Sequence, residues 1–192
     1  EFENGSTEMR SSCFKALTSW KDHSASSALY EICASKNKTY EGPAFDGYVR
    51  QVRTAPVTDE QRLLLYRKIM PFAIDVNRKN QVLNELGKIK LFQSLIFTAK
   101  YLDDPETSGA AAHSVMIIAL PSVDSKTGMT GTLVRGILNK AIPKLSGPEA
   151  EYDKALVSKY IAGLPDDEGF VSMFNGKDLT GWQGLVGTPL TR

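Results

Sequence analysis

Cysteine and histidine are scarce in this chain, with two of each among 192 residues. The sequence has no Cys-x-x-Cys pair, no His-Glu-x-x-His helix and no calcium-binding loop. Two isolated histidines build no three-ligand site unless several carboxylates converge on them. We therefore predict no metal site, and no motif in the sequence indicates a cofactor.

Neither sign of charge dominates, and no long apolar run is present. Lysine and arginine number 23 against 22 aspartates and glutamates, and the longest run of like charge is the Asp-Asp-Glu of 166–168. A nearly neutral chain without a basic stripe offers little attraction to a phosphate backbone, so nucleic-acid binding is not expected. The longest uninterrupted apolar stretch, 115–120, is far shorter than the ~20 residues of a membrane-spanning helix, so no membrane span is expected either.

Apolar residues recur at spacings of three and four over much of the chain, which predicts amphipathic helices. The clearest segment is 90–103. The acids and proline of 103–106 then predict the start of another helix, because these residue types are typical of a first helical turn. This second helix is predicted to end before Pro121. Residues 58–89 repeat this plan, with a break at Asp75. The predicted core positions of these helices are Leu65, Ile69, Phe72, Ala73, Val82, Leu83, Leu86, Leu91, Phe92, Leu95, Ile96, Ala99, Leu102, Ala111, Ala112, Val115, Ile118 and Ala119.

A weak internal repeat relates these two helix pairs. When Asp75 is aligned with Asp104, an offset of 29 residues, apolar positions coincide; they are Val82, Leu83 and Leu86 against Ala111, Ala112 and Val115. Short helix pairs bury their apolar faces only by stacking on neighbours. The Asp-centred turn, the spacing and the small residues of the second helix resemble degenerate HEAT repeats. The resemblance implies an all-α fold over 7–163, with stacked helical hairpins forming a HEAT- or armadillo-like α-α superhelix. The alternative is an irregular helical bundle.

The flanking segments fit the same plan. A first hairpin is predicted to turn at Asp22, a looser stretch follows over 37–56 with a short helix around 45–52, and a loop over 122–131 precedes two final helices, the last over 149–163. The inward-facing residues of these helices are predicted to be Cys13, Phe14, Leu17, Trp20, Ala28, Leu29, Ile32, Cys33, Leu133, Val134, Ile137, Leu138, Ala141, Ile142, Tyr152, Leu156, Tyr160 and Ile161.

The two cysteines fall on the two helices of the predicted first hairpin. Cys13 lies nine residues before Asp22 and Cys33 eleven residues after it, so an antiparallel hairpin would hold them at similar height on facing helices. Two alternatives stay open. One is a disulfide that closes the hairpin in an exported protein, and the other is a pair of buried free thiols that behave as small hydrophobes.

Three other sets of residues are weighed as sites. His113, in the middle of a helix, suits acid–base chemistry if it faces a groove, but a structural histidine is favoured. Asp103 and Asp104 could be read as the paired carboxylates of a glycosidase, although helix caps are the simpler interpretation. Residues 128–132 precede a helix without the phosphate-loop lysine, so a threonine N-cap is predicted there, at position 130 or 132.

The composition changes after Gly163, where proline, glycine and acids predict a linker over 164–169. The Phe-Val-Ser-Met-Phe of 170–174 alternates like a strand, and the Asn-Gly that follows is a tight-turn dipeptide. The run Phe-Asn-Gly-Lys-Asp-Leu-Thr-Gly-Trp over 174–182 resembles the opening of the bacterial 3-keto-disaccharide hydrolases, long catalogued as a domain of unknown function. The residues that carry the resemblance are Phe174, Asn175, Gly176, Asp178, Leu179, Gly181 and Trp182.

This resemblance implies a laminarinase-like β-sandwich acting on glycosidic bonds of saccharides, in an exported, periplasmic or cell-surface bacterial protein. A two-sheet sandwich needs on the order of 100 residues or more. Residues 170–192 are therefore predicted to be its N-terminal fragment, with a short extended tail and with the catalytic residues outside this chain. A strand without its sheet is expected to fray unless it docks on the helices. The chain starts without Met or a targeting signature, so we expect a processed or cut N-terminus.

Together these observations predict a non-catalytic helical repeat module that serves as an interaction surface or spacer before its own C-terminal hydrolase domain. A protein or a carbohydrate on the concave face is a further expected partner. Aromatic candidates for stacking on sugar rings are Trp20, Tyr48, Tyr66 and Tyr101. Two alternatives stay open: the array itself contributes to an active site, which a deep polar pocket would indicate, or it is a stand-alone protein-binding scaffold, which an exposed apolar patch would indicate.

Overall fold

A computed structural model describes residues 5–20, 22–35, 37–123, 126–165 and 177–178. Within these ranges the fold is all-α, as predicted, without a strand. The α-helices are α1 Thr7–Ser19, α2 Ser26–Ala34, α3 Glu41–Thr54, α4 Asp59–Ile69, α5 Val76–Leu86, α6 Phe92–Ala99, α7 Ser108–Ala119, α8 Thr132–Ala141 and α9 Ala150–Ala162. Short 3-10 turns are η1 His23–Ala25, η2 Met70–Phe72, η3 Lys100–Asp103 and η4 Ile142–Lys144. Each helix in these ranges is too short or too polar to cross a membrane.

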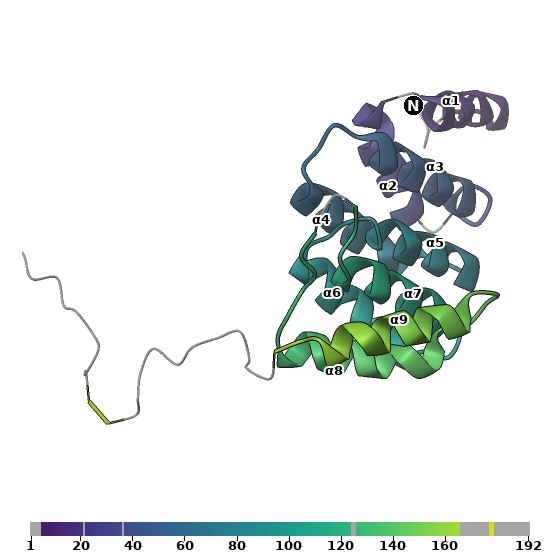
Figure 1. The fold of residues 1–192 in the computed structure, drawn as a ribbon. Helices are drawn as coiled ribbons and strands as arrows, with labels where there is room; N and C mark the ends of the chain where they lie inside the picture. The colour runs from purple at the N-terminus through teal and green to yellow at the C-terminus, as the bar shows by residue number, and fades with distance from the viewer. Residues whose placement is uncertain (1–4, 21, 36, 124–125, 166–176, 179–192) are drawn as a thin grey trace, which may run out of the picture.

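The helices stack in two layers, with α1 at one end and α8 and α9 at the other (Figure 1). In one layer α3 packs on α5, and α5 packs on α7. In the other layer α2, α4, α6 and α8 lie against these helices, so that α2 pairs with α3 and α6 with α7, while α4 packs on both α3 and α5. Stacked helix pairs are therefore present, whereas the superhelical curvature of a HEAT array stays a prediction.

The first helix pair differs from the predicted one. Helix α2 packs chiefly on α3 rather than on α1, and α3 replaces the predicted short helix at 45–52 as the longest described helix. Gly47 permits this close packing, because a Cβ at that position would lie 3.3 Å from the Leu29 side chain. Helix α1 contributes no buried residue, and the predicted inward Trp20 is 51% exposed. The glycines and proline of α3 hid its helical periodicity from sequence reasoning.

Polar caps set several helix ends. Asp75 begins α5 as predicted, and its Oδ1 accepts a hydrogen bond from the N–H of Arg78 at 2.9 Å. The predicted start of α7 at 103–106 is wrong, because that segment forms a turn and the helix begins at Ser108. A threonine cap of α8 is also wrong, since Gly131 is the N-cap, with φ of +106°, a conformation that glycine adopts without steric cost.

Cations from neighbouring elements close the C-terminal ends of helices, where backbone carbonyls lack helical partners. The contacts are Arg62 to Ala55 O at 2.7 Å, Lys90 to Leu120 O at 2.7 Å, and Arg135 to Ile161 O and Leu164 O at 3.2 and 3.0 Å. Arg135 also donates to Pro165 O at 3.2 Å. The chain therefore leaves the last helix in a fixed position at one end of the stack.

Helix α9 turns a different face to the core from the predicted one. Tyr152 and Leu156 are 68% and 38% exposed, whereas Val157 and Asp153 are buried. Successive residues of a helix point about 100° apart, so the side of α9 that carries Asp153 and Val157 differs from the side that carries Tyr152, Leu156 and Tyr160. The stripe of these three residues therefore lies beside the core instead of within it. This second apolar face contributes to the site described below.

Most of the predicted linker and nearly all of the tail, with its signature, lie outside the described residues. Of the seven residues that carry the family resemblance, only Asp178 is described, and it is exposed. The predicted domain at 170–192 is therefore neither supported nor contradicted by the described part of the chain.

Candidate functional site

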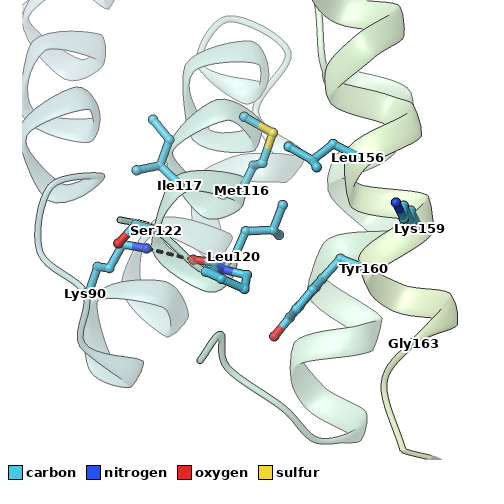
Figure 2. Close-up of a pocket in the computed structure, with 10 residues that line it drawn as sticks. Lys90, Met116, Ile117, Leu120, Ser122, Leu156, Lys159, Tyr160 and Gly163 are labelled. Atoms are coloured by element: carbon cyan, nitrogen blue, oxygen red, sulfur yellow. Dashed lines mark hydrogen bonds between the residues drawn. The ribbon is translucent and has the colours of Figure 1, made fainter. Parts of the chain in front are cut away.

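An open cleft of about 610 Å³ lies between α7 and α9 (Figure 2). Helix α7 contributes Met116 and Ile117, and its C-terminal end adds Leu120. Helix α9 contributes Leu156, Lys159 and Tyr160. The remaining lining residues are Lys90, Pro121, Ser122 and Gly163. This volume lies within the usual range of ligand pockets.

The packing of α8 explains why α7 and α9 leave a cleft. Both helices pack on α8 and on η4, which hold them apart. His113, in the middle of α7, faces Asp153 in the first turn of α9, and Leu120 and Tyr160 line the cleft near the C-terminal ends of these helices, so α7 and α9 run side by side in the same direction. The groove between them is therefore a product of the fold rather than of one displaced side chain.

A short loop closes one end of the cleft by pinning Tyr160. The Tyr160 hydroxyl donates to Met129 O at 2.8 Å, and the N–H of Met129 donates to Ala119 O at 2.8 Å. Gly128 lies against the hydroxyl end of the ring, since a Cβ there would clash with Tyr160 Oη and come within 2.7 Å of Tyr160 Cζ and Ala119 O. Burial raises the pKa of Tyr160 above its ordinary value, which keeps the hydroxyl a hydrogen-bond donor.

His113 and Asp153 form a second contact between α7 and α9, outside the cleft lining. His113 Nδ1 is 3.7 Å from Asp153 Oδ2; the histidine side chain is half exposed, and the carboxylate is buried. At this distance the contact is an ion pair when the imidazole is protonated rather than a good hydrogen bond. The pair links α7 to α9, and the structural role favoured for His113 stays a prediction.

The chemistry of the cleft suits apolar and amphipathic groups. Apolar side chains form most of its surface, and Ile117 and Leu156 are 40% and 38% exposed there. Lys159 is an exposed cation on the α9 side. Among the described residues that line the cleft, none is acidic or histidine, and its titratable side chains are Lys90, Lys159 and Tyr160.

The acids at 103 and 104 have different ion-pair partners. Asp103 lies 2.6 Å from Lys140, and Asp104 lies 3.7 Å from Lys79. The hydrogen bond from Lys140 is the main cause that lowers the pKa of the Asp103 carboxyl. These carboxylates therefore connect η3 and the turn after it to α8 and α5.

Both cysteines are free thiols in the structure. Cys33 is buried and donates its S–H to Glu41 O at 3.6 Å, beside a second, smaller cavity of about 300 Å³. Burial raises the pKa of Cys33 to about 12, so its thiol is protonated and unreactive at neutral pH. Cys13 is half-buried on α1.

The predicted aromatic residues do not form a sugar-binding surface. Tyr48 and Tyr66 are buried in the core, Tyr101 is half-buried, and Trp20 is exposed near the far end of the stack from the cleft. Within the described ranges, no three His, Cys, Asp or Glu side chains are grouped to hold a metal ion.

Sequence reasoning missed the α7 side of the cleft. The signal was present in the apolar run of 115–120, which leaves this part of α7 without a polar face. A helix that is apolar all round is either fully buried or presents a second surface. Val115 and Ile118 face the core, whereas Ile117 on the opposite side lines the cleft.

Comparisons with protein-family models, curated proteins and solved structures find no match to this chain. The resemblances to HEAT repeats and to 3-keto-disaccharide hydrolases therefore stay predictions.

Proposed function

We propose that residues 7–163 are a non-catalytic interaction and spacer module, and that the domain beginning at 170 is a glycoside hydrolase acting on saccharides. The observation that carries the proposal is the position of the apolar cleft. Gly163, where the chain leaves α9, is itself part of the cleft lining. This apolar surface hollow thus lies where the chain leaves the last described helix, towards the segment that resembles the hydrolase family.

The fixed exit of the chain supports the same proposal. Arg135 of α8 binds the carbonyls of Ile161, Leu164 and Pro165, so the direction of the chain is set before the linker begins. A module that holds a neighbouring domain needs a defined exit and an apolar surface beside it. The described part of the chain provides both.

The alternative in which the helices supply active-site residues has less support. Such a site needs acids or histidine converging in one pocket. Asp103, Asp104 and Asp153 are each engaged with a cation or histidine on another helix, outside the cleft lining.

The test compares this 192-residue chain with a chain that carries the whole proposed hydrolase domain, each incubated with 3-keto-disaccharides and with ordinary disaccharides. We expect release of monosaccharide by the longer protein and none above buffer by the 192-residue chain. Turnover by the 192-residue chain at a similar rate would show that the helices are catalytic. Absence of turnover by the longer protein on every saccharide would remove the hydrolase part of the proposal.

A further inference from the structure

We propose that residues 170–174 of this chain dock in the cleft between α7 and α9. The inference goes beyond the proposed function, because it holds whether or not the following domain acts on sugars. It concerns a segment outside the described residues and the surface that this segment can reach.

The length of the linker permits the contact. Residue 170 is five residues after Pro165 and residue 174 is nine after it, and an extended chain covers at most about 17 Å and about 30 Å over these lengths. Arg135 fixes the starting point beside Gly163 in the cleft lining. The segment is therefore long enough to return to the cleft lining beside Gly163.

The sequence of the segment is largely apolar on both sides of a strand. Phe170 and Phe174 fall on one face with Ser172 between them, and Val171 and Met173 fall on the other. A strand with one face in water alternates apolar and polar residues, whereas a strand covered on both faces is apolar throughout. One face would contact Ile117 and Leu156 of the cleft, and the other is left for the sheet of the domain that begins there.

Charge favours the same arrangement. The Asp-Asp-Glu of 166–168 immediately precedes the segment, and Lys159 and Lys90 belong to the cleft lining. If the acids of 166–168 lie beside these lysines, the apolar residues of 170–174 lie over the apolar part of the cleft. Because the segment is tethered, its effective concentration is in the millimolar range, so weak docking is enough to populate the contact.

Hydrogen exchange of the 192-residue chain tests the docking directly. The amides of 170–174 are expected to exchange about tenfold more slowly than in an unstructured peptide, the factor that burying one phenylalanine side chain would give. Leu156→Asp, which places a carboxylate in the cleft, is expected to abolish this protection. Leu133→Asp is the matched control, because Leu133 is an exposed leucine of α8 outside the cleft lining, and the protection is expected to persist there.

Phe174→Asp tests the contact from the side of the segment without altering any helix. Binding of the dye anilinonaphthalene sulfonate is expected to be weak in the wild type and to rise in Phe174→Asp, because the apolar cleft is then uncovered. Equal exchange at 170–174 in the wild type, Leu156→Asp and Leu133→Asp overturns the proposal. Protection that disappears on tenfold dilution of the protein also overturns it, because that result assigns the cleft to a second copy of the chain.

Discussion

Gly128→Ala is expected to be the most damaging single-methyl change at the cleft. The added Cβ would clash with Tyr160 Oη and meet Tyr160 Cζ and Ala119 O at 2.7 Å. Two of these atoms belong to a ring held by a hydrogen bond, and the third is backbone, so none moves away cheaply. The loop must shift, which breaks the bonds of Met129 to Ala119 and to Tyr160.

The expected loss follows from these contacts. Overpacking of this kind typically costs about 1–3 kcal/mol, and each lost hydrogen bond about 0.5–1.5 kcal/mol. When the loop shifts, it relieves the clash and breaks the hydrogen bonds at the same time. The two free-energy costs therefore overlap and are not simply added. We expect the free energy of unfolding to fall by about 2–4 kcal/mol, within the range that core defects produce.

Gly136→Ala is the matched control. Gly136 lies inside α8, and a Cβ there meets nothing within 4 Å. The same change is therefore expected to stabilise the helix by about 0.5–1 kcal/mol. Both variants remove the same backbone freedom from the unfolded chain, so the difference between them measures contacts in the folded state.

Urea unfolding followed by far-ultraviolet circular dichroism supplies the comparison. A third variant, Tyr160→Ala, removes two of the three close atoms, so adding Gly128→Ala to it is expected to cost less than in the wild type. If Gly128→Ala proves as stable as Gly136→Ala, the loop does not hold Tyr160 as described, and this account of the cleft end is wrong.

Three further predictions concern titration and reactivity. The hydrogen bond from the Arg78 N–H is the main cause that lowers the pKa of the Asp75 carboxyl. The ionised carboxylate therefore stabilises the fold above its ordinary pKa, and this stabilisation is lost as the pH falls through the folded-state pKa. Asp75→Asn is expected to make the urea midpoint fall less steeply at acid pH. Burial raises the pKa of Tyr48 to about 12. The stabilisation from the buried, neutral hydroxyl is complete below the ordinary pKa of 10 and is lost as the pH rises through about 12. Tyr48→Phe is expected to reduce this alkaline loss in the same titration. Iodoacetamide is expected to modify Cys13 faster than Cys33 in the folded protein and both at similar rates in urea, as read by peptide mass.

Helical periodicity predicted the all-α class and most inward-facing residues, because the apolar faces of α5, α7 and α8 pack on several neighbours at once. Leu83 and Leu86, for example, are fully buried as expected. The prediction was less successful at the edges of the stack. Helix α9 packs on one side only, so its apolar residues can belong either to the core or to the cleft. The sequence pattern predicts Leu156 in the core, whereas in the structure it lines the cleft.

Pairing of the helices was not predictable from periodicity alone. The alignment of Asp75 with Asp104 gave an offset of 29 residues, yet the first residues of α5 and α7, Val76 and Ser108, are 32 residues apart. Apolar residues recur at both spacings, so the pattern fits either register. The contacts that decide the register, such as Lys79 with Asp104, join residues far apart in the sequence and leave no local signal.

Helix ends closed from a distance were likewise invisible in the sequence. Arg135 and Lys90 each bind carbonyls about 30 residues away, and nothing in their own neighbourhood marks them as caps. The cleft depends on both, since one fixes the exit of the chain and the other the end of α7. The candidate site therefore emerged from the packing of helices rather than from any motif.

The central claim is that the cleft between α7 and α9 receives the chain that leaves it. Its most direct test is a nitroxide label at position 177, introduced as Lys177→Cys with Cys13 and Cys33 replaced by alanine, three residues beyond the proposed docking segment. Nuclear magnetic resonance is predicted to show strong broadening of the methyl signals of Ile117 and Leu156, with those of Leu64 on α4 unaffected. Equal, weak broadening of all three residues would contradict the account.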